Sequence, residues 1–171
     1  MMVANATGCS SIYGGSSPTC PYTKNEKGHG PAWANSLFED NAEFGYGMRV
    51  AAAQREALVA QKVDEVLENG CADELKAALE NWKANRHDGL ASQEAAEAVK
   101  ALLPEAIKAD SKNAAALEVI ENNADQLVKK SIWCFGGDGW AYDIGYGGVD
   151  HVLAQGKDIN VLVLDTEVYS N

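Results

Sequence analysis

The fold of this chain follows from ten residues, Ser131-Ile132-Trp133-Cys134-Phe135-Gly136-Gly137-Asp138-Gly139-Trp140. The first five are β-branched, aromatic or small, which is typical of a short buried strand, and the glycines after them predict a turn. Such a turn lets main-chain N–H groups approach a ligand, and Asp138 adds the hard carboxylate oxygen that Mg²⁺ prefers. Asp138 is therefore a candidate metal ligand, although most Gly-Asp-Gly triplets are ordinary turns.

The residues downstream extend this turn into a β-α-β unit. Residues 141–155 have the apolar spacing of a glycine-rich helix, and residues 159–165, which are mostly apolar, predict a second buried strand. Because such crossovers are right-handed, the loops after Phe135 and Leu164 should meet at the carboxyl edge of a parallel sheet. We therefore predict an α/β fold of three layers with a mainly parallel sheet, whose two loops contact one ligand.

Separate blocks of the sequence resemble one enzyme family. The first two blocks are Gly137-Asp138-Gly139-Trp140-Ala141-Tyr142-Asp143-Ile144-Gly145-Tyr146-Gly147-Gly148 and Asp165-Thr166-Glu167-Val168-Tyr169-Ser170-Asn171. Together they resemble the motif of thiamine diphosphate enzymes, and more narrowly the cofactor domain of pyruvate:ferredoxin (flavodoxin) oxidoreductases. The N-terminal blocks Ala4 to Gly15 and Gly30 to Gly45 are similar to the same family in the same order.

The resemblance implies a site for Mg²⁺ and thiamine diphosphate. It makes the Asp138 carboxylate, the Thr166 side chain and the Val168 carbonyl the protein ligands of Mg²⁺, and it places Asn171 near the reactive thiazolium as a catalytic residue. The residues that would line the cofactor are Gly137, Asp138, Gly139, Trp140, Thr166, Glu167, Val168, Tyr169, Ser170 and Asn171. Without the resemblance, Thr166 and Asn171 would be interpreted as parts of a turn that ends a strand.

The resemblance also makes Cys9 a cofactor-site residue, as one thiolate ligand of a 4Fe–4S cluster. Such a cluster needs four thiolates, and the family's Cys-x-x-Cys pair and downstream cysteine have no counterparts here, so only one ligand is present in this chain. Taken by itself, Cys9 would be a small buried residue. We interpret Cys20, Cys71 and Cys134 as packing or incidental residues, because they lack the spacing of a zinc site.

The activity implied by the family is oxidative decarboxylation of pyruvate to acetyl-coenzyme A and CO₂. Electrons would pass singly through iron–sulfur clusters to ferredoxin or flavodoxin, in an enzyme that is a homodimer when complete. Members of the family that it resembles continue past the position of Asn171, so we expect residues 1–171 to be a truncated thiamine diphosphate-binding domain that is inactive alone and needs the rest of the polypeptide. Two alternatives stay open: another thiamine diphosphate-dependent 2-oxoacid enzyme, and an inactive structural fragment.

Residues 47–130 predict an acidic helical insertion within this domain. Between Glu56 and Asp125 there are 15 acidic and 7 basic residues. Apolar side chains recur there at helical spacing in four groups, with breaks expected at 69–70, 85–89 and 108–113, and Pro104 could kink the third helix. We interpret the charged side as a solvated face in preference to a docking surface.

Composition excludes other classes of function. The net charge of −11 argues against nucleic acid and anionic membranes as partners, because both select a clustered basic face. The sequence contains neither an apolar run of about eighteen residues nor a signal peptide, so we expect a cytoplasmic protein with no disulfides. His29, His87 and His151 are too scattered to predict a metal site.

Overall fold

The computed structural model describes residues 1–11 and 22–168. Contacts divide the chain into two compact units, one of residues 1–50 and 131–171 and the other of residues 51–130.

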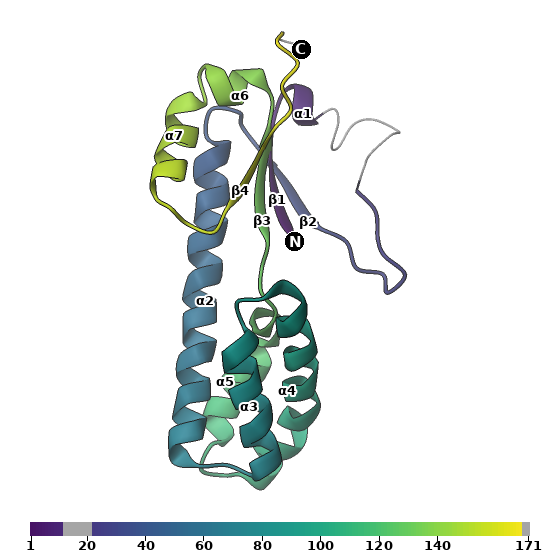
Figure 1. Cartoon of the computed structure of the whole chain (residues 1–171), viewed down its shortest axis with the longest axis vertical. Coiled ribbons are helices and arrows are strands. Elements are labelled where there is room, and N and C mark those ends of the chain that lie inside the picture. Colours follow the sequence, from purple (N-terminus) through teal and green to yellow (C-terminus); the bar gives the residue numbers. More distant parts are fainter. Residues whose placement is uncertain (12–21, 169–171) are drawn as a thin grey trace. The chain divides into compact units, whose positions relative to one another are not determined.

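The first unit is built on a parallel sheet of four strands (Figure 1). The strands lie in the order β2-β1-β3-β4 and are β1 (Met2–Ala6), β2 (Ala32–Ser36), β3 (Ile132–Gly136) and β4 (Asn160–Val163). In the register, Val3 of β1 pairs with Trp33 on one side and Trp133 on the other. The predicted α/β class with a parallel sheet is confirmed. The sequence did not predict β2 as a strand, because it lies at an edge and lacks a strong apolar pattern.

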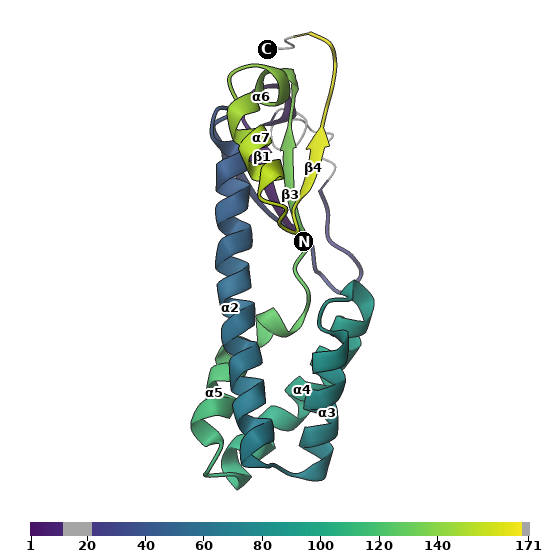
Figure 2. The same ribbon diagram turned by 60° about the vertical axis from the view of Figure 1, so that its left-hand side comes forward.

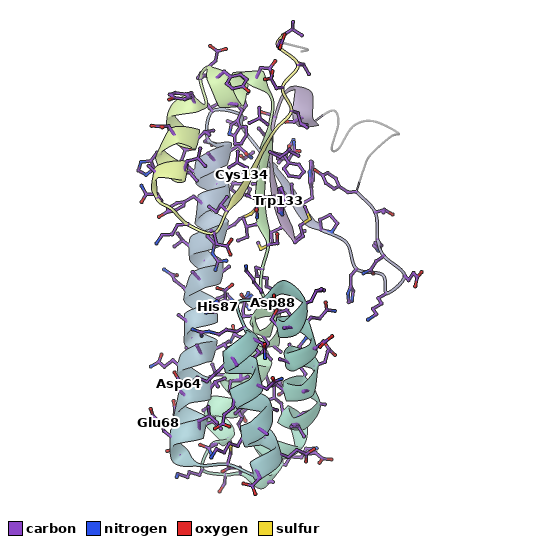
Figure 3. All side chains as sticks on the ribbon, in the orientation of Figure 1. Asp64, Glu68, His87, Asp88, Trp133 and Cys134 are labelled. Carbon is purple, nitrogen blue, oxygen red and sulfur yellow. The ribbon has the colours of Figure 1, made fainter. Side chains whose placement is uncertain are left out.

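Successive side chains of β3 point to opposite faces of the sheet, as Trp133 and Cys134 do in Figure 3. The face of Ala4 and Cys134 is covered by α6 (Asp138–Tyr142), α7 (Tyr146–Ala154) and the beginning of α2 (Asn41–Asn69), with Trp140 fully buried among them. On the opposite face Tyr22 stacks on Phe135 with ring centroids 6.4 Å apart. This arrangement is consistent with the predicted three layers.

Glycines permit the closest approaches in this core. A Cβ atom on Gly45 of α2 would overlap the sulfur of Cys134, and one on Gly136 would overlap the ring of Trp140. A Cβ atom on Gly145 would overlap the carbonyl oxygens of Trp140 and Phe38. Gly145 lies in the break between α6 and α7. The single helix predicted over 141–155 is therefore wrong, because the chain turns there to bring the Gly145 backbone against its neighbours.

The second unit is helical and has its own core. It contains the rest of α2 with α3 (Asp73–Asn85), α4 (Gly89–Ala109), α5 (Ala114–Asn122) and the 3₁₀ helix η2 (Ala124–Leu127) (Figure 2). The largest buried side chain is Trp82, whose indole N–H donates to the Leu127 carbonyl at 2.7 Å. The helices end where the sequence predicted, and α4 continues through Pro104. The apolar spacing of Leu117, Ile120, Ala124 and Leu127 predicts one helix, but α5 ends at Asn122, where the Asn123 side chain donates to the Val119 carbonyl, and Ala124 and Leu127 lie in η2.

Acidic side chains lie on the outside of this helical unit. Asp64 and Glu68 are one turn apart on α2 (Figure 3), and Asp64 pairs with Lys83 of α3. Within residues 1–11 and 22–168, every helix is too short or too polar to cross a membrane.

Candidate metal and cofactor site

The strand order places a topological switch point between β1 and β3. The chain leaves β1 toward β2 on one side and leaves β3 toward β4 on the other, so the connections diverge at the carboxyl ends of the two central strands. In open parallel sheets, ligands bind in the crevice at such a point. Asp138 begins α6 after β3, and Cys9 begins the short helix α1 (Cys9–Ser11) after β1. α1 contacts both β1 and β3.

The three predicted Mg²⁺ ligands lie together at this edge. The Thr166 main-chain N–H donates to Asp138 Oδ1 at 3.1 Å, and Thr166 Oγ1 lies 3.0 Å from Asp138 Oδ2. Thr166 Oγ1 also lies 2.9 Å from the carbonyl oxygen of Val168. Residues 28 positions apart in the sequence are thus joined through both the main chain and the side chain of Thr166.

These contacts keep the Asp138 carboxylate ionised. The main-chain N–H of Thr166 is the largest cause that lowers the Asp138 pKa below 3.8, and the Thr166 hydroxyl lowers it further. A hydrogen bond to a carboxylate stabilises its charged form. Asp138 is therefore an anionic oxygen donor at neutral pH.

A pocket of about 330 Å³ adjoins this cluster. Its lining residues are Asp138, Tyr142, Asp143, Asp165, Glu167 and Val168. Four of them carry carboxylates, and none of these described lining residues is basic. A diphosphate would be repelled by this set unless a cation came with it, because like charges at close range raise the free energy of the complex.

The donor set fits Mg²⁺ in chemistry and spacing. A carboxylate, a hydroxyl and a carbonyl are all hard oxygen ligands, and adjacent ligands in an octahedron of about 2.1 Å radius are about 3.0 Å apart. The separations of 3.0 and 2.9 Å around Thr166 Oγ1 match that value, and in this structure the single hydrogen of the Thr166 hydroxyl serves both contacts. Among the described residues, no three His, Cys, Asp or Glu side chains form a metal-binding group. The predicted set instead combines one acid with a hydroxyl and a carbonyl.

Two residues at the site were not assigned a role from the sequence. The Tyr142 hydroxyl of α6 donates to Asp165 Oδ2 at 3.0 Å, which raises the Tyr142 pKa, and Asp165 Oδ1 accepts the Glu167 main-chain N–H at 3.0 Å. Glu167 has a φ of 61°, which is rare for a residue other than glycine. An Asp that bonds the main chain two residues on forms an Asx turn, and that pattern was the available signal.

The remaining predicted residues are placed to different degrees. Gly137 and Gly139 flank Asp138 at the start of α6, while the Trp140 ring is buried in the core. For Cys9 the structure gives the position of the backbone, at the start of α1, and its predicted role as a cluster ligand stays a prediction. Tyr169, Ser170, Asn171 and Cys20 lie outside the described residues, so their predicted roles stay predictions.

Comparison with known proteins finds relatives of the whole chain. Residues 54–110 match the family model described as the insertion domain of pyruvate-ferredoxin oxidoreductase. The whole chain is 59% identical to a pyruvate:ferredoxin oxidoreductase of Moorella thermoacetica and 52% identical to a pyruvate-flavodoxin oxidoreductase of Klebsiella pneumoniae. It is also 45% identical, over its full length, to a pyruvate dehydrogenase of Cryptosporidium parvum that is named for NADP(+). The chain spans 15%, 14% and 10% of the lengths of these relatives.

Proposed function

The chain belongs to the pyruvate:ferredoxin (flavodoxin) oxidoreductase family, and from this we propose that it supplies the Mg²⁺–diphosphate half of a thiamine diphosphate site. The enzyme so served would oxidise pyruvate to acetyl-coenzyme A and CO₂. We propose a cytoplasmic location and, for the complete enzyme, a homodimer.

The observation that carries the proposal is the position of Thr166. Its hydroxyl oxygen lies 3.0 Å from an Asp138 oxygen and 2.9 Å from the Val168 carbonyl oxygen. Three hard donors at that spacing are suited to one small divalent cation. The acidic lining of the pocket supports the same conclusion, because the pocket attracts a cation directly and a diphosphate only together with one.

Apart from Asn171, the site residues of this chain would bind and orient the cofactor and would take no part in bond cleavage. When bound, thiamine diphosphate supplies the electron sink for decarboxylation. Asp138, Thr166 and Val168 would hold the metal through oxygen atoms, and Gly137 and Gly139 would let the main chain approach the diphosphate closely. Asn171 would lie near the thiazolium.

Cys9 would provide one thiolate to a 4Fe–4S cluster beside this site. Its position after β1, the strand that pairs with β3, supports this role, because the loop after β3 carries Asp138 and ligands of both loops would share one edge of the sheet. The names of the relatives mention different electron acceptors, namely ferredoxin, flavodoxin and NADP(+). We propose ferredoxin or flavodoxin, the acceptors named for the two relatives of higher identity quoted above.

The proposal is tested by calorimetric titration of the chain with thiamine diphosphate, with and without Mg²⁺. We expect binding only when Mg²⁺ is present. Asp138→Asn and Thr166→Val should each weaken it by at least about tenfold, since the first removes the negative charge of a metal ligand and the second removes the ligand oxygen, and a charge-assisted contact is worth about 1.5–3 kcal/mol.

Asp143→Asn is the matched control for charge. Asp143 lines the same pocket but is not a predicted ligand, so its neutralisation should cost less affinity than Asp138→Asn. An equal loss in both variants would show that the pocket acts through total charge and not through ligation. A folded wild-type chain that binds no thiamine diphosphate with Mg²⁺ would contradict the proposed site in this chain.

A further inference from the structure

Two connections join α6 to the loop of residues 165–168. The first is the pair of contacts between Asp138 and Thr166, at 3.1 and 3.0 Å. The second is the hydrogen bond from the Tyr142 hydroxyl to Asp165 Oδ2, at 3.0 Å. The two connections differ in whether they use the oxygen atoms that would bind the metal.

The first connection uses the atoms that the proposed metal site needs. The Thr166 hydroxyl contacts an Asp138 oxygen and the Val168 carbonyl oxygen, and all three of these oxygens are proposed Mg²⁺ ligands. A cation bound there would share those lone pairs and turn the hydroxyl hydrogen away from them. Part of the first connection would therefore be exchanged for metal coordination.

The second connection uses none of those atoms. Tyr142 is at the end of α6, four residues after Asp138, and Asp165 immediately precedes Thr166. The other Asp165 oxygen accepts the Glu167 main-chain N–H at 3.0 Å, which stabilises the left-handed conformation of Glu167. One carboxylate thus fixes the turn that carries Thr166 and Val168, and also fastens that turn to the helix that carries Asp138.

We infer that Tyr142 and Asp165 are positioning residues for the Mg²⁺–diphosphate site, holding the Thr166–Val168 turn at the spacing that the metal requires. This inference rests on the proposed function. Mg²⁺ demands near-ideal octahedral geometry, whereas Ca²⁺ accepts longer and more variable contacts. A looser turn should therefore cost affinity for Mg²⁺ and should reduce the discrimination between the two ions.

The test compares Tyr142→Phe with Tyr146→Phe in the full 171-residue chain. Both changes remove one hydroxyl from an exposed tyrosine, 57% exposed at position 142 and 55% at position 146. Within the described part of the chain, the Tyr146 hydroxyl makes no hydrogen bond. Thiamine diphosphate binding is measured by calorimetry across a series of Mg²⁺ concentrations, and again with Ca²⁺, and each variant is melted to record Tm.

We expect Tyr142→Phe to raise the Mg²⁺ concentration for half-maximal binding about three- to tenfold, as the loss of one hydrogen bond predicts. The preference for Mg²⁺ over Ca²⁺ should fall at the same time. Tyr146→Phe should match the wild type in both measurements. Asp165→Asn keeps one acceptor oxygen for the Glu167 N–H, so its Mg²⁺ concentration for half-maximal binding should lie between those of Tyr142→Phe and Asp165→Ala.

The outcomes separate the two proposals. Wild-type binding with an unchanged Mg²⁺ midpoint and ion preference in Tyr142→Phe overturns the positioning role and leaves the proposed function standing. A lower Tm in Tyr142→Phe without a change in midpoint or ion preference also overturns it, because the bond would then be structural only. No binding by the folded wild-type chain overturns the proposed function and, with it, this inference.

Discussion

Cys134 lies at the centre of the sheet with no exposed surface, and burial raises the pKa of its thiol from 9.0 to about 11. Because the folded pKa is the higher one, this thiol contributes its full stability below about pH 9 and loses it as the pH rises toward 11. The loss at pH 11 should be about 2 kcal/mol. It is measured as the difference between wild type and Cys134→Ala in urea unfolding across that pH range.

Comparison with Cys134→Ala removes the common effects of tyrosine and lysine titration. The difference in free energy of unfolding between wild type and Cys134→Ala should decrease as the pH rises. This holds even if Cys134→Ala is less stable at neutral pH because of the atoms it removes. A constant gap from pH 8 to pH 11 would show that the thiol does not ionise differently in the folded state.

Single residues at the site could be predicted where local chemistry is distinctive. Asp138 was predicted because glycines surround it at the end of an apolar run, and the resemblance supplied Thr166 and Val168. The hydrogen bond between Tyr142 and Asp165 could not be predicted, because a contact across 23 residues depends on where α6 and the last loop lie in space. The packing of Gly45 against Cys134 was likewise invisible, since the two residues belong to different elements.

At the level of elements, α2 packs against the sheet through a glycine. Gly45→Ala should destabilise the chain by about 1–3 kcal/mol, because the new methyl group overlaps the sulfur of Cys134 and no flexible side-chain end can yield. Gly47 lies in the same helix with open space around it, so Gly47→Ala should instead stabilise by up to about 1 kcal/mol. Urea unfolding of both variants checks the opposite signs.

A double variant identifies the contact responsible. Adding Cys134→Ala to Gly45→Ala removes the overlapping sulfur, so the two changes together should cost less than the sum of their separate costs. Strictly additive effects would mean that the loss in Gly45→Ala arises elsewhere.

The first turn of α4 is stabilised by Asp88 (Figure 3), whose Oδ1 accepts the main-chain N–H groups of Leu90 at 3.0 Å and Ala91 at 2.8 Å. Asp88→Ala should lower the free energy of unfolding by about 0.5–2 kcal/mol. Asp88→Asn keeps the acceptor oxygen and should lower it much less. Thermal unfolding followed by circular dichroism measures both. The converse change is Ala72→Ser at the start of α3, where no side chain caps the helix, and it should raise stability.

Helices were predictable because apolar spacing repeats along the sequence. Where the predicted helices differ from the structure, the cause is tertiary packing. Polar residues at 69–70, 85–89 and 108–113 ended helices as expected. The break at Gly145 arises from close packing of its backbone against Phe38 and Trp140, which no local pattern shows. The strand β2 was missed because an edge strand needs less apolar character than a central one.

At the level of the whole molecule, the helical unit should fold by itself. Every member of its buried cluster lies between Val59 and Leu127, within residues 51–130. A peptide of residues 51–130 should therefore be helical and unfold cooperatively. Trp82, the sole tryptophan in that range, reports the transition through its fluorescence, because its buried indole bonds Leu127. A gradual, non-cooperative melt would contradict this prediction.

The central pairing of the sheet also sets an order of events during synthesis. β1 pairs with β3, with Met2 opposite Ile132. This pairing cannot form until all of residues 51–130 have been synthesised. At about 5–20 residues per second, the interval from residue 6 to residue 132 lasts roughly 6–25 s. Helical units with local contacts fold in far less time than that. The helices should thus be complete on the ribosome while the edge of β1 that later pairs with β3 is still open to other strands.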